Sequence, residues 1–253
     1  MKNSKIIRVF VALLFWICLW QWGAWELSRH VQWSDLLLPF PMDVLKRLTE
    51  LMGTAHFWLT ALYSLGRVFA AFLAGAVIGS LFAVLCALSP LLSALISPAM
   101  TVVRATPIAS FIVLLILWLP GAGWVSFVAA VLMTAPIFWA NLGRGMESVD
   151  PKLLEMSAAY RFSRGQKLKH IYLPQIRPAL ASACEIGVGL AWKAGVAAEV
   201  LTRPELAIGR MVYETRMYLE TADLFAWTAL VVALSLLVEK GVRHLVRKAV
   251  RDD

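Results

Sequence analysis

The chain has 253 residues, of which 60% are hydrophobic and 16% are charged, and its formal net charge is +8 at pH 7. A soluble globular domain has about 25% charged residues, so this composition excludes an ordinary water-soluble fold. The basic residues lie between and beside apolar runs, which indicates membrane topology rather than nucleic-acid binding. We therefore expect an all-α integral membrane protein that contacts the lipid bilayer and no nucleic acid.

The first apolar run covers residues 6–25 and follows Lys2, Lys5 and Arg8. A positive start before an apolar stretch is also typical of a secretory signal peptide, but that stretch is shorter and ends in small residues. Here the run continues into a tryptophan-rich end, and Trp favours the membrane interface. The sequence predicts an uncleaved transmembrane helix.

Five further runs are each long enough to cross a hydrocarbon core, which needs about 20 residues of helix. They cover 61–88, 91–119, 124–142, 178–201 and 224–242. With the first run they predict about six crossings, so both termini should lie on the same side of the membrane.

Lys and Arg are concentrated in the connection 143–177 and in the tail after residue 242. The positive-inside rule places both segments in the cytoplasm. Segments 26–60 and 202–223 offset their basic residues with acidic ones, and we expect them outside.

The predicted organisation has three parts. Residues 1–57 hold the first transmembrane helix and an external segment, residues 58–243 form the main transmembrane domain, and residues 244–253 form a basic cytoplasmic tail. Within the main domain, residues 150–175 form a cytoplasmic loop with helical structure of its own.

No pattern in the sequence predicts covalent chemistry or metal binding. Cys18, Cys86 and Cys184 lie within apolar runs, where packing is the expected role, and the four His residues are scattered. No Gly is followed by Lys, so a phosphate-binding loop is not predicted, and any ATP and Mg²⁺ should be used by another chain. We expect no catalytic residue and no bound cofactor. Gly75 and Gly79, at G-x-x-x-G spacing, predict close helix packing inside the bundle.

The connection between the fourth and fifth runs contains two helix starts in succession. Asp150 can cap a helix that has Pro151 at its first position, where the missing N–H costs nothing. Ser163 and Gln166 form an S-x-x-Q capping box, and Pro174 is expected to end the second helix. The apolar residues of these helices exceed what a solvated linker needs, which favours a partner surface or contact with the underside of the bundle.

The segment Glu155–Pro174, EMSAAYRFSRGQKLKHIYLP, resembles the cytoplasmic EAA loop of the permeases of binding-protein-dependent type I ABC importers, in particular the nitrate, sulfonate and taurine branch. In that family Glu-Ala-Ala is followed by a turn glycine and then by Ile-x-Leu-Pro. Glu155, Ile171, Leu173 and Pro174 match at the expected offsets. Segments 38–44, 64–68 and 104–107 are also similar, in the family's order.

Two departures from the family pattern concern the turn of this loop. Met156 and Ser157 replace the two alanines, and Arg161 stands where the family has its glycine. A left-handed Arg would be strained by about 1–3 kcal/mol, so we expect another turn geometry, with Gly165 absorbing part of the change. The resemblance implies an ATPase-coupling role for Glu155, Ser157, Arg161, Ser163, Gly165, Ile171, Leu173 and Pro174.

The resemblance implies a transport mechanism with several partners. Two permease subunits, expected to be a homodimer, enclose a path in the bacterial inner membrane, and two cytoplasmic ABC ATPase subunits act on it through the EAA loop. An external solute-binding protein presents the solute, with sulfonate, nitrate and a vitamin precursor all open as substrates. A secondary transporter and a membrane-embedded enzyme are the alternatives, but we find neither an internal repeat nor a convergent catalytic set.

Among the charged residues inside the apolar runs, we single out Arg104, Glu185, Lys193 and Glu199 as candidates for the solute path or for internal ion pairs. A charge at the bilayer centre costs about 2.5–3.5 kcal/mol on insertion scales, so these side chains should face protein or water. Lys193 is too far along and around its helix from either Glu to pair with it, since eight residues span about 12 Å and six residues turn about 240°. We expect its counter-ion on another helix, and both an internal ion pair and contact with the solute path remain open.

Overall fold

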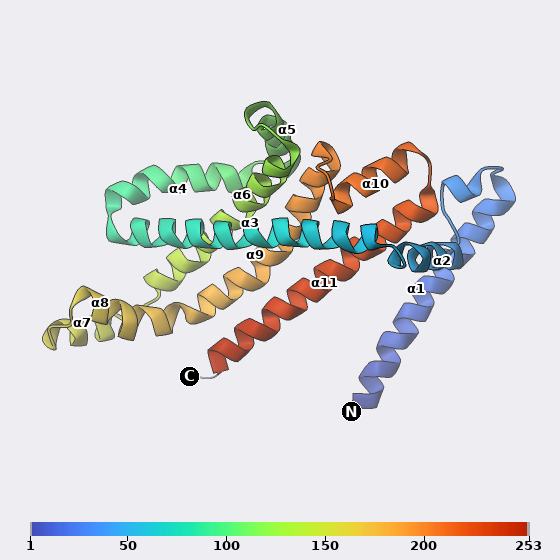
Figure 1. The fold of residues 1–253 in the computed structure, drawn as a ribbon. Helices are drawn as coiled ribbons and strands as arrows, with labels where there is room; N and C mark the ends of the chain where they lie inside the picture. The colour runs from blue at the N-terminus through green and yellow to red at the C-terminus, as the bar shows by residue number, and fades with distance from the viewer. Residues whose placement is uncertain (1, 252–253) are drawn as a thin grey trace.

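A computed structural model describes residues 2–251, and within this range the chain folds into helices and short connections (Figure 1). Side chains are described except at residues 2–6, 9, 164 and 249–251, so the predicted roles of Lys2, Lys5 and the Arg164 side chain fall outside the description. The elements are α1 (Lys2–His30), η1 (Ser34–Leu36), α2 (Pro41–Met52), α3 (Ala55–Leu88), α4 (Pro90–Ala105), α5 (Ile108–Trp118), α6 (Ala122–Glu147), α7 (Pro151–Ala159), α8 (Arg164–Lys167), η2 (Leu168–Tyr172), α9 (Leu173–Thr202), α10 (Ile208–Met217) and α11 (Thr221–Arg251).

Five of the helical segments are long and apolar enough to cross a membrane, and a sixth crossing is supplied if one bent pair counts as a span. The five segments are Phe10–His30, Ala55–Leu88, Ala122–Glu147, Gly165–Thr202 and Thr221–Lys248. The chain is therefore the all-helical membrane protein that the apolar runs predict.

The third predicted run, 91–119, is not one straight crossing. It divides into α4 and α5, which are bent by 109° at the break between them. Pro107 disfavours a helical conformation at the preceding residue, and Thr106 is accordingly extended at φ −78° and ψ 131°. The proline of the Arg-Ala-Thr-Pro segment therefore turns the chain within the run.

The core of the bundle forms where α3, α6, α9 and α11 pack together. Phe57, Phe72, Phe138, Trp192 and Trp227 belong to one buried cluster at this centre. The prediction for the two α3 glycines is confirmed: a Cβ on Gly79 would lie 2.1 Å from the Ala135 carbonyl oxygen, and one on Gly75 would lie 2.6 Å from Thr134 Cβ.

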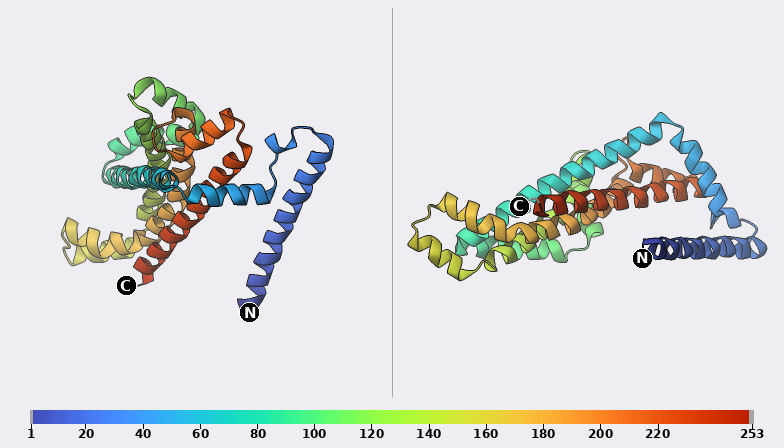
Figure 2. Two further views of the ribbon diagram at one scale, coloured as in Figure 1. Left: turned by 45° about the vertical axis from the view of Figure 1, so that its right-hand side comes forward. Right: turned by 90° about the horizontal axis from the view of Figure 1, so that it is seen from below.

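Helix α1 stands apart from the rest of the bundle in two views (Figure 2). Only 6% of its most apolar window is buried inside the chain. It is held at one end, where Trp20 Nε1 donates a hydrogen bond of 3.1 Å to the Pro39 carbonyl and the Trp20 ring stacks on Phe225 at 5.6 Å. The rest of this apolar helix is free to contact lipid or another subunit.

The segment between α1 and α3 is fastened to the start of α11 by an ion pair. Arg47 Nη2 donates to Asp223 Oδ2 at 3.0 Å, its Nε donates to Asp223 Oδ1, and its Nη1 donates to Glu50 Oε2 at 2.8 Å. These hydrogen bonds to the two carboxylates raise the pKa of the Arg47 guanidinium further above its usual value. The Arg47 guanidinium therefore remains charged at every physiological pH.

Candidate functional site

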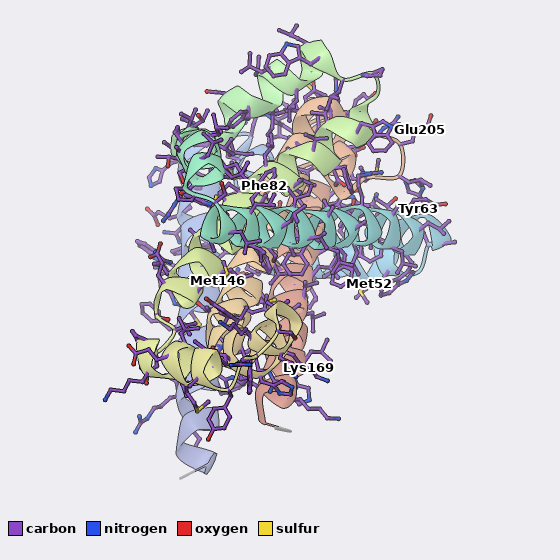
Figure 3. All side chains as sticks on the ribbon, turned by 90° about the vertical axis from the view of Figure 1, so that its left-hand side faces the viewer. Met52, Tyr63, Phe82, Met146, Lys169 and Glu205 are labelled. Carbon is purple, nitrogen blue, oxygen red and sulfur yellow. The ribbon has the colours of Figure 1, made fainter. Side chains whose placement is uncertain are left out.

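The short helices α7 and α8 project from one end of the bundle, at the left of Figure 1. Figure 3 labels Lys169 beside them, and Glu205 near the other end of the molecule. Both predicted helix starts are confirmed. The Asp150 side chain accepts from Lys152 N at 2.9 Å, while Ser163 N donates to Gln166 Oε1 at 2.8 Å and Gln166 N donates to Ser163 Oγ at 3.3 Å.

The turn after α7 is closed by two backbone hydrogen bonds that satisfy the last carbonyls of the helix. Phe162 N donates to Ser157 O at 2.9 Å and Arg161 N donates to Ala158 O at 3.0 Å, the pattern of a Schellman motif. Arg161 has φ 52°, so the expectation of another turn geometry is wrong. Gly165 lies inside α8 without a positive φ and absorbs none of the change. Arg161 therefore keeps the left-handed turn for which glycine is the unstrained residue.

The prediction that Pro174 ends the second helix is also wrong. The helix continues from α8 through a π-helical turn, Leu168–Tyr172, into α9, so that one apolar helical segment runs from Gly165 to Thr202. A proline lacks the N–H for the usual bond and clashes with the carbonyl four residues before it, and a wider π turn relieves both problems. The projecting α8 is therefore joined without a break to a membrane-spanning helix.

The α7–α8 end presents apolar side chains to solvent. Tyr160 is 74% exposed, and Leu153, Met156, Leu168 and Leu173 are exposed as well. Glu155 is exposed beside them, and no hydrogen bond or ion pair holds it within the described part of the chain. Ser157 and Ile171 are buried and attach the loop to the rest of the molecule, which leaves the exposed apolar residues without a cover.

Glu199 lies at the centre of a buried polar network near the far end of α9. Its carboxylate is 0% exposed and accepts hydrogen bonds from Arg67 Nη1 at 2.6 Å, Ser64 Oγ at 2.8 Å and Gly209 N at 3.3 Å. Ser64 Oγ in turn accepts from Ile208 N at 2.8 Å. The network joins α3, α9 and α10 around one carboxylate.

Glu185 also has a partner on another helix, because Arg243 Nε of α11 lies 3.5 Å from its Oε2. Arg104 is exposed and lines a groove of about 640 Å³ between α3, α4 and α6, together with Ser97, Thr101 and Arg144. Lys193 is exposed on α9 and forms no ion pair with any described residue. The four intramembrane charges are therefore not gathered into one site.

Three partners of these charges were missed by reasoning from the sequence: Ser64, Arg67 and Arg243. Ser64 and Arg67 lie in a segment that had been noted only as similar to a family. Their separations of 135 and 132 residues from Glu199 give no local signal of contact. Two signs were available: Arg67 is a charge inside the apolar run 61–88, and its three-residue spacing from Ser64 puts both residues on one face of α3.

A family model described as "Binding-protein-dependent transport system inner membrane component" matches residues 75–251. This chain belongs to that family. It is 27% identical over 231 residues to the taurine transport system permease protein TauC of Escherichia coli (strain K12), covering 88% of this chain and 83% of TauC. It is 28% identical over 212 residues to the nitrate import permease protein NrtB of Synechocystis sp. (strain ATCC 27184 / PCC 6803 / Kazusa), covering 79% of this chain and 73% of NrtB.

Solved structures of importers share the fold of this permease. A bacterial alginate ABC transporter in complex with a pentasaccharide-bound periplasmic protein matches with a TM-score of 0.66 at 14% identity, covering 99% of this chain and 96% of that chain. The MetNI methionine ABC transporter in an inward-facing conformation matches with a TM-score of 0.63 at 19% identity, covering 77% of this chain and 97% of that chain. The architecture is therefore that of a type I ABC importer permease.

Proposed function

We propose that this permease forms the translocation path of an ATP-driven importer and couples it to a separate cytoplasmic ATPase through the α7–α8 loop. The observation that carries the proposal is the uncovered apolar surface around Tyr160 and Glu155, on helices that lead directly into α9. An ABC ATPase would supply ATP and Mg²⁺, and this chain would bind neither. An exposed apolar patch rimmed by polar and charged residues is typical of a protein interface.

Force on the loop would reach the membrane through a continuous helical connection. Asp150 N donates to Gln175 Oε1 at 3.1 Å, so the start of α7 is tied to the first turn of α9. The Schellman turn and the capping box fix α7 and α8 relative to each other. A displacement of the loop on closure of the ATPases would therefore move α9 as a rigid element rather than bend a linker.

The orientation we propose follows from this role. The loop, both termini and the basic tail 244–253 face the cytoplasm, whereas η1, α2 and α10 lie outside, where a solute-binding protein would dock. A second copy of this chain would complete the path. The ion pairs of Arg47 with Asp223 and Glu50, and the hydrogen-bond network around Glu199, would then stabilise the external end of each subunit.

The relatives narrow the proposed substrate class. Their names refer to taurine, nitrate and bicarbonate, and each of these small solutes carries an anionic group at neutral pH. We propose that this permease transports a small solute with an anionic group, such as a sulfonate or nitrate. A thermal-shift screen of such solutes on the partner binding protein would identify it.

Co-purification tests the coupling part of the proposal. The ATPase should be recovered with the wild-type permease, and a Cys introduced at Tyr160 should form a cross-link to it that a Cys at Tyr218, on the opposite side of the membrane, does not. Recovery of an intact permease dimer without any ATPase, or equal cross-linking from both positions, would contradict a coupling role for α7–α8.

A further inference from the structure

Lys193 lies about 14 Å from the outer end of α9, in the last third of the membrane-spanning segment Gly165–Thr202. Its side chain is exposed on the surface of the subunit, yet a lone ammonium facing hydrocarbon costs about 2.5–3.5 kcal/mol on insertion scales and more in simulations. Ala197, one turn further along α9, packs against the α5–α6 cluster. Ala197 is only about 40° around the helix from Lys193, so α5 and α6 cover one side of this face of α9, and a counter-ion within the subunit has to come from the other side, where α11 packs.

Three contacts fix the register of α9 against α11. Arg243 pairs with Glu185, the Glu239 carboxylate lies over Gly189, and Trp192 Nε1 donates to the Val231 carbonyl at 3.1 Å. Residue numbers rise along α9 as they fall along α11, so the two helices are antiparallel neighbours, as Figure 1 shows. Glu239 is thus the acid of α11 that lies next to the turn of α9 preceding Lys193.

Two contacts locate the Glu239 carboxylate beside α9. Its Oε1 lies 2.8 Å from the place where a Cβ on Gly189 would be, and it accepts from Ser235 Oγ at 3.3 Å. No described cation pairs with it: Arg243 is bound to Glu185, and Lys240, the next residue, is about 100° further around α11. A half-buried carboxylate in a membrane span is therefore also short of a counter-ion.

The two unpaired charges are within reach of each other. Residues four apart on a helix have Cβ atoms about 5–6 Å apart, and helical side chains point back toward the helix N-terminus. In the usual helical rotamers a side chain at Lys193 extends toward the turn of Gly189, where the carboxylate lies. A change of rotamer would bring them together, whereas in this structure they are more than the 4.0 Å of an ion pair apart. Gly189 makes room for the carboxylate, which any larger residue would displace.

We infer that Glu239 is the acid with which Lys193 pairs after a change of rotamer, and that the anionic group of a passing solute competes with Glu239 for the ammonium. Lys193 is then the residue that selects for an anionic group, and Glu239 is its positioning residue. This role rests on the proposed function, because it requires the Lys193 face of α9 to line the path. Because Lys193 is exposed and not bonded to Glu239 in this structure, its ammonium is accessible to a solute.

A charge-swap experiment tests the pair without any solute. The melting temperature of the purified permease–ATPase complex is measured for Lys193→Glu, Glu239→Lys and the double swap. We expect each single reversal to lower it by about 2–4 °C or more and the double swap to recover at least half of the loss. The control is Lys193→Glu with Glu185→Lys, which places the new Lys beside Arg243 and should recover nothing. If the melting temperature of the double swap falls by as much as the two single losses added together, Lys193 and Glu239 do not pair.

Uptake of labelled taurine, nitrate and bicarbonate tests the selection step. For the anion that the wild type transports, Lys193→Gln should raise KM about tenfold, whereas Glu239→Gln should lower KM because it removes the competing carboxylate. An unchanged KM in both variants, or no uptake of these three anions by the wild type, would overturn the anion-selecting role. If the importer function itself fails, the charge-swap result still decides whether the pair exists.

Discussion

The strongest energetic prediction concerns the contact between Arg67 and Glu199. The carboxylate is 0% exposed and the Arg67 side chain is 17% exposed, so water compensates little if the guanidinium is removed. In Arg67→Met the carboxylate keeps only Ser64 Oγ and Gly209 N as donors. Breaking a buried pair by removing one partner costs about 3–5 kcal/mol, and the remaining donors favour the low end, about 3 kcal/mol. The melting temperature of the purified complex should then fall by about 6–12 °C.

Two further variants make this reasoning refutable. The double variant Arg67→Met with Glu199→Gln should be more stable than Arg67→Met alone, because the second change removes the buried charge that the first leaves unpaired. Arg210→Met is the matched control, since Arg210 pairs with Glu214 at 2.7 Å but the two side chains are 38% and 37% exposed. Such an exposed pair contributes about 0–1 kcal/mol. Additive losses in the double variant, or equal losses for Arg67→Met and Arg210→Met, would refute the reasoning.

Three other predictions concern the loop and its orientation. Glu155→Lys should leave membrane insertion intact but lower both ATPase recovery and solute-stimulated ATP hydrolysis, because it reverses the charge on the proposed docking surface; normal recovery with normal transport would remove Glu155 from the coupling surface. Arg161→Gly should raise the melting temperature, since it relieves about 1 kcal/mol or more of left-handed strain at φ 52°, and a lowered melting temperature would show that the Arg side chain outweighs this strain. An impermeant thiol reagent on intact cells should label a Cys at Glu50 and not one at Lys167, and the reverse pattern would invert the proposed topology.

Features of the fold set by neighbouring residues could be predicted from the sequence. Asp150 with Pro151 and Ser163 with Gln166 are complete within a few residues, so their capping roles follow from local chemistry. The apolar runs predict the crossings for the same reason. The two prolines show what local sequence does not determine. A proline removes one helical hydrogen bond, but the sequence does not say whether the chain compensates by bending, as at Pro107, or by widening the helix, as in the π turn before Pro174.

The polar contacts inside the membrane could not be predicted, because they join residues far apart in the chain. The cost of an intramembrane charge identified Glu199 and Glu185 as residues that need partners, but it could not name Arg67 or Arg243 as those partners. Partner choice depends on the register of α9 against α3 and α11, which is set by close packing at Gly189 and Gly195. Gly195 leaves room for Val68, since a Cβ there would lie 2.5 Å from Val68 Cγ2.

The most direct test of the account is uptake into proteoliposomes that contain this permease, its ATPase and the partner binding protein. We predict accumulation of an anionic solute that requires all three proteins and hydrolysable ATP on the side of the α7–α8 loop, and that is lost when ATP is replaced by a non-hydrolysable analogue. Accumulation without the ATPase, driven by an ion gradient instead, would contradict the central claim.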